Sequence, residues 1–169
     1  MLRKIWWTTA LAAAALAGAA AQTACTGGSQ DAAVEAGLAR GFGLYYLDEG
    51  ASAKLAYGQA NSDNVGLMLQ CTKGSRAVEV SDLVRSTPAP TLALISAGAR
   101  TEVKVSVQPG DGQSVVTGQT RSAAPALSGF RRSGKLEVAF AGLRYGIRVK
   151  PAEKPSVERF FADCEKGEA

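Results

Sequence analysis

The clearest hairpin pattern in the chain is KLEVAFAGLRYGIRVK, residues 135–150. Apolar and polar residues alternate on both sides of Ala141-Gly142, a pattern that predicts two strands joined by a two-residue turn. The register set by this turn pairs apolar residues throughout: Phe140 with Leu143, Val138 with Tyr145, and Leu136 with Ile147. A shift by one residue would break every pair, so only one register fits. We therefore expect a β-hairpin with one apolar face.

The opposite face of the predicted hairpin is basic. Lys135 lies directly opposite Arg148 in this register, and like charges that face each other destabilise a strand pair. Such a cost can persist where an anionic partner uses the charges. Alternatively, the residues form a solvated face whose basic side chains discourage edge-to-edge aggregation. The candidate residues for binding an anionic surface are Arg131, Arg132, Lys135, Arg144, Arg148 and Lys150.

Alternating apolar residues also mark strands on the N-terminal side of the hairpin. The clearest runs place on one face Ala53, Leu55 and Tyr57; Val65, Leu67, Leu69 and Cys71; and Val103, Val105 and Val107. Turn-forming residues separate the runs, as at 61–64 and 109–112, and the stretch 47–50 is expected to be a further turn. Many short strands at regular spacing predict a mainly β protein, with an antiparallel sheet folded as a sandwich or small barrel.

The chain is expected to end in a helix that packs on this sheet. Val157, Phe160, Phe161 and Cys164 fall at i, i+3, i+4 and i+7 and form one apolar stripe. Ser156 is the expected N-cap of this helix. A short helical turn is also expected around 127–132. These elements predict a single globular domain over residues 43–169.

The N-terminal residues 1–24 have the three parts of a signal peptide. Arg3 and Lys4 form the charged region, residues 5–17 are apolar, and Ala19-Ala20-Ala21 offers a cleavage site. A retained single-span anchor is the alternative for the same segment. The signal predicts export to the periplasm or the cell exterior, with residues 25–42 as a flexible leader.

Cys25 supports a second processing route. The run Thr23-Ala24-Cys25 fits the end of a lipoprotein signal, although Gln22 is not the apolar residue that usually precedes it. The polar residues 26–30 resemble the tether that follows a lipidated cysteine. Lipidation of Cys25 would also remove the odd thiol of a chain with three cysteines. A membrane-anchored lipoprotein is therefore the alternative localisation.

The other two cysteines are expected to form a disulfide. Cys71 lies on the apolar face of a predicted strand, and Cys164 lies on the apolar face of the last helix. Both should point into one core, and thiols that meet in an oxidising compartment pair readily. Two buried free thiols are the alternative. In either case the role of Cys71 and Cys164 is structural.

The sequence offers little for catalysis. It contains no histidine, the commonest general base and metal ligand in proteins, and no Ser-x-x-Lys, Gly-x-Ser-x-Gly or phosphate-binding glycine pattern. No catalytic residue, metal ligand or cofactor is predicted. The adjacent carboxylates Asp48 and Glu49 leave open a small hydrolase that works without histidine. The formal net charge of +4 falls to +2 without Arg3 and Lys4, which does not indicate nucleic acid binding.

Several short runs carry a resemblance to a known group of proteins. They are YLDEG at 46–50, KLAYG at 54–58, NSDNVGL at 61–67 with Cys71, and the closing RFFADC at 159–164. In these runs the chain resembles small uncharacterised exported proteins of bacteria. The resemblance implies export and the cysteine pair, and no activity. We expect a non-enzymatic binding or structural protein of the envelope, whose partner is an anionic envelope component or an envelope protein.

Overall fold

The computed structural model describes residues 41–85, 89–110 and 112–166, which form nine strands and two α-helices. The strands are β1 (Phe42–Glu49), β2 (Ser52–Gln59), β3 (Val65–Thr72), β4 (Ala77–Val84), β5 (Thr91–Ser96), β6 (Ala99–Pro109), β7 (Ser114–Arg121), β8 (Lys135–Phe140) and β9 (Leu143–Arg148). The helices are α2 (Pro125–Ser133) and α3 (Lys154–Lys166), and a 3-10 turn, η1 (Pro151–Glu153), precedes α3. The expected signal peptide, Cys25 and nearly all of the leader 25–42 lie outside the described residues.

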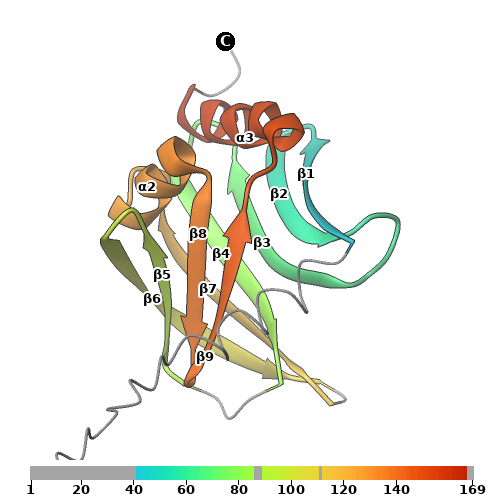
Figure 1. Cartoon of the computed structure of the whole chain (residues 1–169), viewed down its shortest axis with the longest axis vertical. Coiled ribbons are helices and arrows are strands. Elements are labelled where there is room, and N and C mark those ends of the chain that lie inside the picture. Colours follow the sequence, from blue (N-terminus) through green and yellow to red (C-terminus); the bar gives the residue numbers. More distant parts are fainter. Residues whose placement is uncertain (1–40, 86–88, 111, 167–169) are drawn as a thin grey trace, which may run out of the picture.

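All nine strands belong to one antiparallel sheet in the order β1-β2-β3-β4-β7-β6-β5-β8-β9. The sheet curls strongly on itself, so that it forms a half-barrel with β1 and β9 as its two edges (Figure 1). The prediction of a mainly β fold with a C-terminal helix packed on the sheet is confirmed. Between the two expected forms, the curled sheet is closer to the small barrel.

The hairpin at 135–150 has the predicted register. Phe140 pairs with Leu143, and Lys135 pairs with Arg148. The turn residues Ala141 and Gly142 have φ angles of 49° and 84°. Positive φ at both central residues is what a type I′ turn requires, and this turn matches the twist of the strands that it joins.

Both helices lie at one end of the half-barrel, at the top of Figure 1. α2 packs on β5, β6 and β8, whereas α3 packs on β1 and β2. Their buried rings meet, since Phe161 is 6.4 Å from Phe130 and 5.4 Å from Phe160 between ring centroids. The expected apolar stripe of the last helix is the face that α3 buries: Val157, Phe160, Phe161 and Cys164. These rings close this end of the core.

Two local expectations are wrong. Ser156 is not the N-cap, because α3 already begins at Lys154 and η1 leads into it. The Glu153 carboxylate accepts a hydrogen bond from the Lys150 N–H at 2.9 Å, which supports the chain at this entry. Most of the expected turn at 47–50 is strand, because β1 continues to Glu49, which pairs with Ser52 of β2. The same strand begins at Phe42, one residue inside the expected leader.

Cys71 of β3 and Cys164 of α3 lie at disulfide distance, with their Cα atoms 5.7 Å apart. Both are buried, as their apolar positions predict. Beside them, the turn between β3 and β4 caps the end of α3: the Arg76 N–H donates to the Cys164 carbonyl at 3.0 Å. Such a pair is compatible with an exported protein. None of the helices in the described ranges has the length and apolar character needed to cross a membrane.

Candidate functional site

A shallow groove lies on the outer face of the β8–β9 hairpin. Its volume is about 380 Å³. The hollow forms because Gly146, which has no side chain, occupies an outward position opposite Glu137. We call this hollow the outer groove and define it by the residues that line it from outside: Ile95, Ala97, Lys135, Glu137, Arg144, Gly146 and Arg148.

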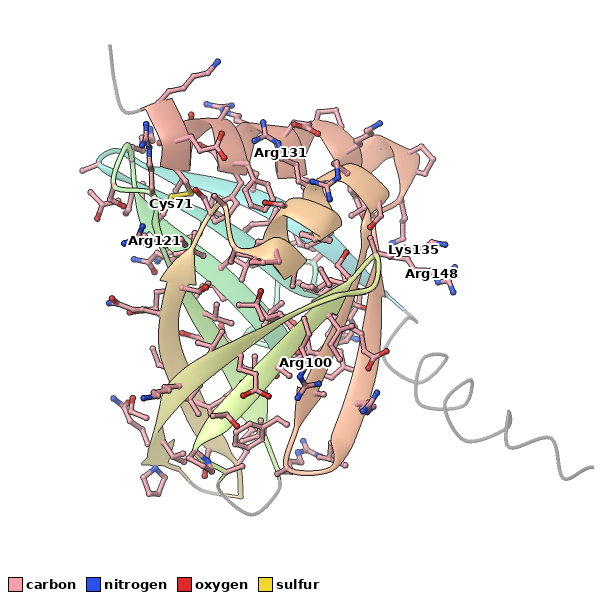
Figure 2. The ribbon with its side chains drawn as sticks, turned by 90° about the vertical axis from the view of Figure 1, so that its left-hand side faces the viewer. Cys71, Arg100, Arg121, Arg131, Lys135 and Arg148 are labelled. Carbon is pink, nitrogen blue, oxygen red and sulfur yellow. A yellow bond between two sulfur atoms is a disulfide. The ribbon has the colours of Figure 1, made fainter. Side chains whose placement is uncertain are left out.

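Three basic residues line the outer groove. Lys135 and Arg148 form a directly opposed pair, and Figure 2 shows them next to each other and projecting away from the sheet. Arg144 lies further along β9, where it donates to Glu137 at 2.8 Å. Both partners of this ion pair are well exposed, and exposed pairs contribute only about 0–1 kcal/mol. Arg144 can therefore exchange Glu137 for a bound anion at small cost.

Arg131 lies apart from the outer groove. Its guanidinium donates to Glu158 and to Glu165, both at 3.0 Å, and stacks on the ring of Phe161 at 5.5 Å. Figure 2 shows it between α2 and α3. Arg131 thus ties the two helices together, and its charge is matched by two carboxylates.

Arg132 and Lys150 line a different hollow of about 280 Å³, together with Arg131 and Lys154. Lys150 does not continue the basic face of the hairpin, because β9 ends at Arg148 and strand alternation ends with it. Its ammonium donates to the Phe42 carbonyl at 2.7 Å and pairs with Glu153 at 3.3 Å. The six predicted residues therefore form two groups: Lys135, Arg144 and Arg148 line the outer groove, and Arg131, Arg132 and Lys150 line the other hollow.

A second site, which sequence reasoning missed, lies inside the half-barrel at the end away from the helices. This inner cavity has a volume of about 470 Å³. Its apolar wall consists of Phe42, Tyr57, Val65, Val84, Phe140 and Leu143, and its exposed rim consists of Gln59, Asn64, Arg85 and Gln113. Asp82 and Tyr145 also line it, and the Tyr145 hydroxyl donates to the Asp82 carboxylate at 2.9 Å. One sequence signal exists: Val78, Val80 and Val84 alternate with outward residues, which places Asp82 on the inward face.

Burial perturbs both members of this pair. Only 4% of Asp82 is exposed, and burial raises the pKa of its carboxyl from 3.8 to about 7. The hydrogen bonds from the Tyr145 hydroxyl and the Leu83 N–H act in the opposite direction but are weaker. Burial, followed by the nearby Asp82, also raises the pKa of Tyr145 well above 10. The hydroxyl therefore keeps its proton and remains a donor.

The carboxylates Asp48 and Glu49 do not converge on a shared site. Asp48 pairs with Lys73 at 2.9 Å and with Arg159 at 3.1 Å, whereas Glu49 pairs with Lys54 at 2.8 Å. The hydrogen bond from Lys73 lowers the pKa of Asp48. This geometry lends no support to an acid–base pair. Within the described residues, no group of three or more acidic or cysteine side chains is placed to hold a metal ion.

No protein family model matches the chain, and no curated protein or solved structure is significantly similar to it. Together, the fold and the two sites define a curled antiparallel β protein with a basic outer groove and a partly apolar inner cavity.

Proposed function

We propose that this chain is an exported, non-enzymatic binding protein of the bacterial envelope whose outer groove holds an anionic group of an envelope component. The observation that carries the proposal is the direct opposition of Lys135 and Arg148 at the rim of a hollow. Arg144 lines the same hollow from further along β9. A phosphate or carboxylate in the outer groove would face three basic side chains.

The energetics favour an anion in this position. Two cations that face each other across a strand pair repel each other. An anion between them turns this repulsion into attraction, and hydrogen bonds from Arg or Lys to phosphate or carboxylate are about twice as strong as neutral ones. Because these side chains are exposed, their interaction with an anion is screened beyond about 8 Å at physiological ionic strength. Binding should therefore be sensitive to salt.

Export is part of the proposal and rests on two supports. One is the signal-like sequence of residues 1–24, with lipidation of Cys25 as the alternative route to the envelope. The other is the Cys71–Cys164 pair, since disulfides persist in oxidising compartments. The intact mass of protein recovered from the envelope tests this part. A chain that begins near Gln22, or a lipidated one that begins at Cys25, supports export with removal of the signal, whereas a chain that retains Trp6 and Trp7 contradicts that removal.

Co-sedimentation tests the binding. The protein is mixed at low and at physiological salt with phosphatidylglycerol vesicles, phosphatidylcholine vesicles or purified cell-wall fragments. We expect sedimentation with at least one anionic material, none with phosphatidylcholine, and a steep loss as salt rises. The vesicle and cell-wall arms distinguish a lipid head group from a wall polymer as the source of the anion. The proposal would be contradicted if the protein sedimented as well with phosphatidylcholine vesicles as with the anionic materials. It would also be contradicted if the protein sedimented with none of these materials.

A further inference from the structure

The inner cavity has the size and the wall of a small-molecule site. Its volume of about 470 Å³ lies within the range of roughly 300–1,000 Å³ that is usual for such sites. Phe42 and Tyr57 provide tilted rings 5.2 Å apart, and Phe140 also lines the cavity. Polar residues of the rim surround the opening. A ligand with an apolar body can enter here and bury it against aromatic surface.

The polar group at the wall sets the chemistry of the ligand. The hydrogen-bond donors that act on Asp82 are the hydroxyl of Tyr145 and the backbone N–H of Leu83, and both are neutral. Arg85 is the other charged residue of the lining, but it is exposed at the rim and does not contribute to the pKa of Asp82. Among the described residues, the groups that hydrogen-bond to the buried Asp82 carboxyl are therefore neutral and not cationic.

Buried charges in proteins are paired, because removing an isolated carboxylate from water is very costly. A ligand that brings a cation into the cavity would supply the missing partner. An ammonium group satisfies the carboxylate by charge and by hydrogen bonding, and an attached apolar tail satisfies the aromatic wall. A neutral alcohol would fill the same space but would not pair with the charge.

We propose that the inner cavity binds a small amphiphilic amine, whose ammonium group hydrogen-bonds to the Asp82 carboxylate while its apolar part packs on Phe42, Tyr57 and Phe140. This site lies inside the half-barrel and shares no charged residue with the outer groove. The proposal is therefore independent of the proposed function.

Proton binding to Asp82 gives the proposal a distinctive pH dependence. Because the pKa of Asp82 is raised to about 7, the carboxyl is largely neutral at about pH 5.5 and largely ionised at about pH 8. The other titratable groups that face it are Tyr145 from β9, whose own pKa is further affected by Tyr57 from β2, and Arg85 at the rim. Because burial raises the pKa of Tyr145 well above 10, its hydroxyl keeps its proton over this range. Amine binding should thus strengthen as Asp82 ionises.

Three probes of equal chain length test the proposal: hexylamine, hexanol and hexanoate. Each is titrated into the exported chain, purified after expression of the full sequence, by isothermal calorimetry at about pH 5.5 and pH 8. We expect hexylamine to bind at least tenfold more tightly than hexanol at the higher pH and hexanoate to bind most weakly. At the lower pH the difference between amine and alcohol should largely disappear.

Two variants isolate the carboxylate. Asp82→Asn keeps an oxygen that can accept from Tyr145 and resembles the protonated acid, so it should fold; it should reduce hexylamine affinity to the level of hexanol. Asp48→Asn removes an exposed carboxylate of β1 and should leave the affinity unchanged. Equal binding of amine and alcohol at pH 8, full amine binding by Asp82→Asn, or binding of no probe would overturn the proposal. In those cases Asp82 only links β4 to β9.

Discussion

Tyr145 and Asp82 join two distant strands of the sheet through one hydrogen bond of 2.9 Å. Asp82 belongs to β4 and Tyr145 to the edge strand β9, with β7, β6, β5 and β8 between them in the sheet. The bond can form only because the sheet curls until these two strands face each other. This hydrogen bond therefore makes contact between β4 and β9 of the curled sheet depend on one titratable group, the carboxyl of Asp82.

The first prediction concerns the pH dependence of stability. The folded-state pKa of Asp82, about 7, lies above its ordinary value of 3.8, so folding favours the protonated form. The resulting stability is fully present below about pH 4 and is lost as pH rises through 7. Each tenfold change in proton affinity corresponds to about 1.4 kcal/mol, so the loss is at most about 4 kcal/mol.

Asp82→Asn cannot titrate and should lose this dependence. Denaturant unfolding of both proteins between pH 4 and pH 8 measures it. The free energy of unfolding of the variant should rise relative to that of the wild type as pH increases. Parallel curves for the two proteins would show that Asp82 titrates normally in the folded state.

The second prediction concerns Tyr46, which links β1 to α3. Its hydroxyl donates to the Asp163 carboxylate, and Arg159 stacks on its ring at 4.6 Å. Burial, followed by Asp163, raises the pKa of Tyr46 to about 12. Tyr46→Phe keeps the ring but removes a hydrogen bond to a charged group, which should cost about 1.5–3 kcal/mol of the free energy of unfolding.

Tyr45→Phe is the matched control, because Tyr45 is its neighbour in β1 and is 40% exposed. Denaturant unfolding of the two variants should show a loss for Tyr46→Phe and little change for Tyr45→Phe. In an alkaline absorbance titration, Tyr46→Phe should remove a tyrosine that ionises at about pH 12, whereas Tyr45→Phe should leave this ionisation in place. Equal effects of the two substitutions would refute the link between β1 and α3.

The third prediction concerns the Cys71–Cys164 pair, whose members are 93 residues apart in the sequence. Loss of a disulfide from a small exported domain costs about 2–5 kcal/mol. Cys71→Ala and Cys164→Ala break the same bond, so each single variant and the double variant should lose a similar amount. Unfolding under non-reducing conditions measures these losses. If the two single losses add up in the double variant, the cysteines are not joined.

Features that depend on residues close together in the sequence could be predicted, whereas contacts between distant residues could not. Two-residue alternation around Ala141-Gly142 was enough for the hairpin register, including the opposition of Lys135 and Arg148. The same rule failed for Lys150, because alternation carries no information about where a strand ends. Alternation could place Asp82 on an inward face, but its partner Tyr145 lies 63 residues away in the sequence. Only the curvature of the sheet brings them together.

Binding of the anionic component should depend on the position of the basic residues in the outer groove and not on net charge. Two double variants with the same change in charge test it: Arg144→Glu/Arg148→Glu in the groove and Arg100→Glu/Arg121→Glu outside it. Each double variant includes one arginine that belongs to an exposed ion pair, Arg144 with Glu137 or Arg100 with Glu102. Figure 2 shows Arg121 on the opposite side of the view from Lys135 and Arg148.

The decisive measurement is co-sedimentation of the wild type and both double variants with the anionic material that binds the wild type, at low ionic strength. We expect the groove variant to stay in the supernatant and the control variant to retain most of the wild-type binding. Circular dichroism should show that both variants keep the β fold, because all four side chains are exposed. Equal loss of binding in the two variants would rule out the outer groove as the binding site, since net charge alone would then explain the association.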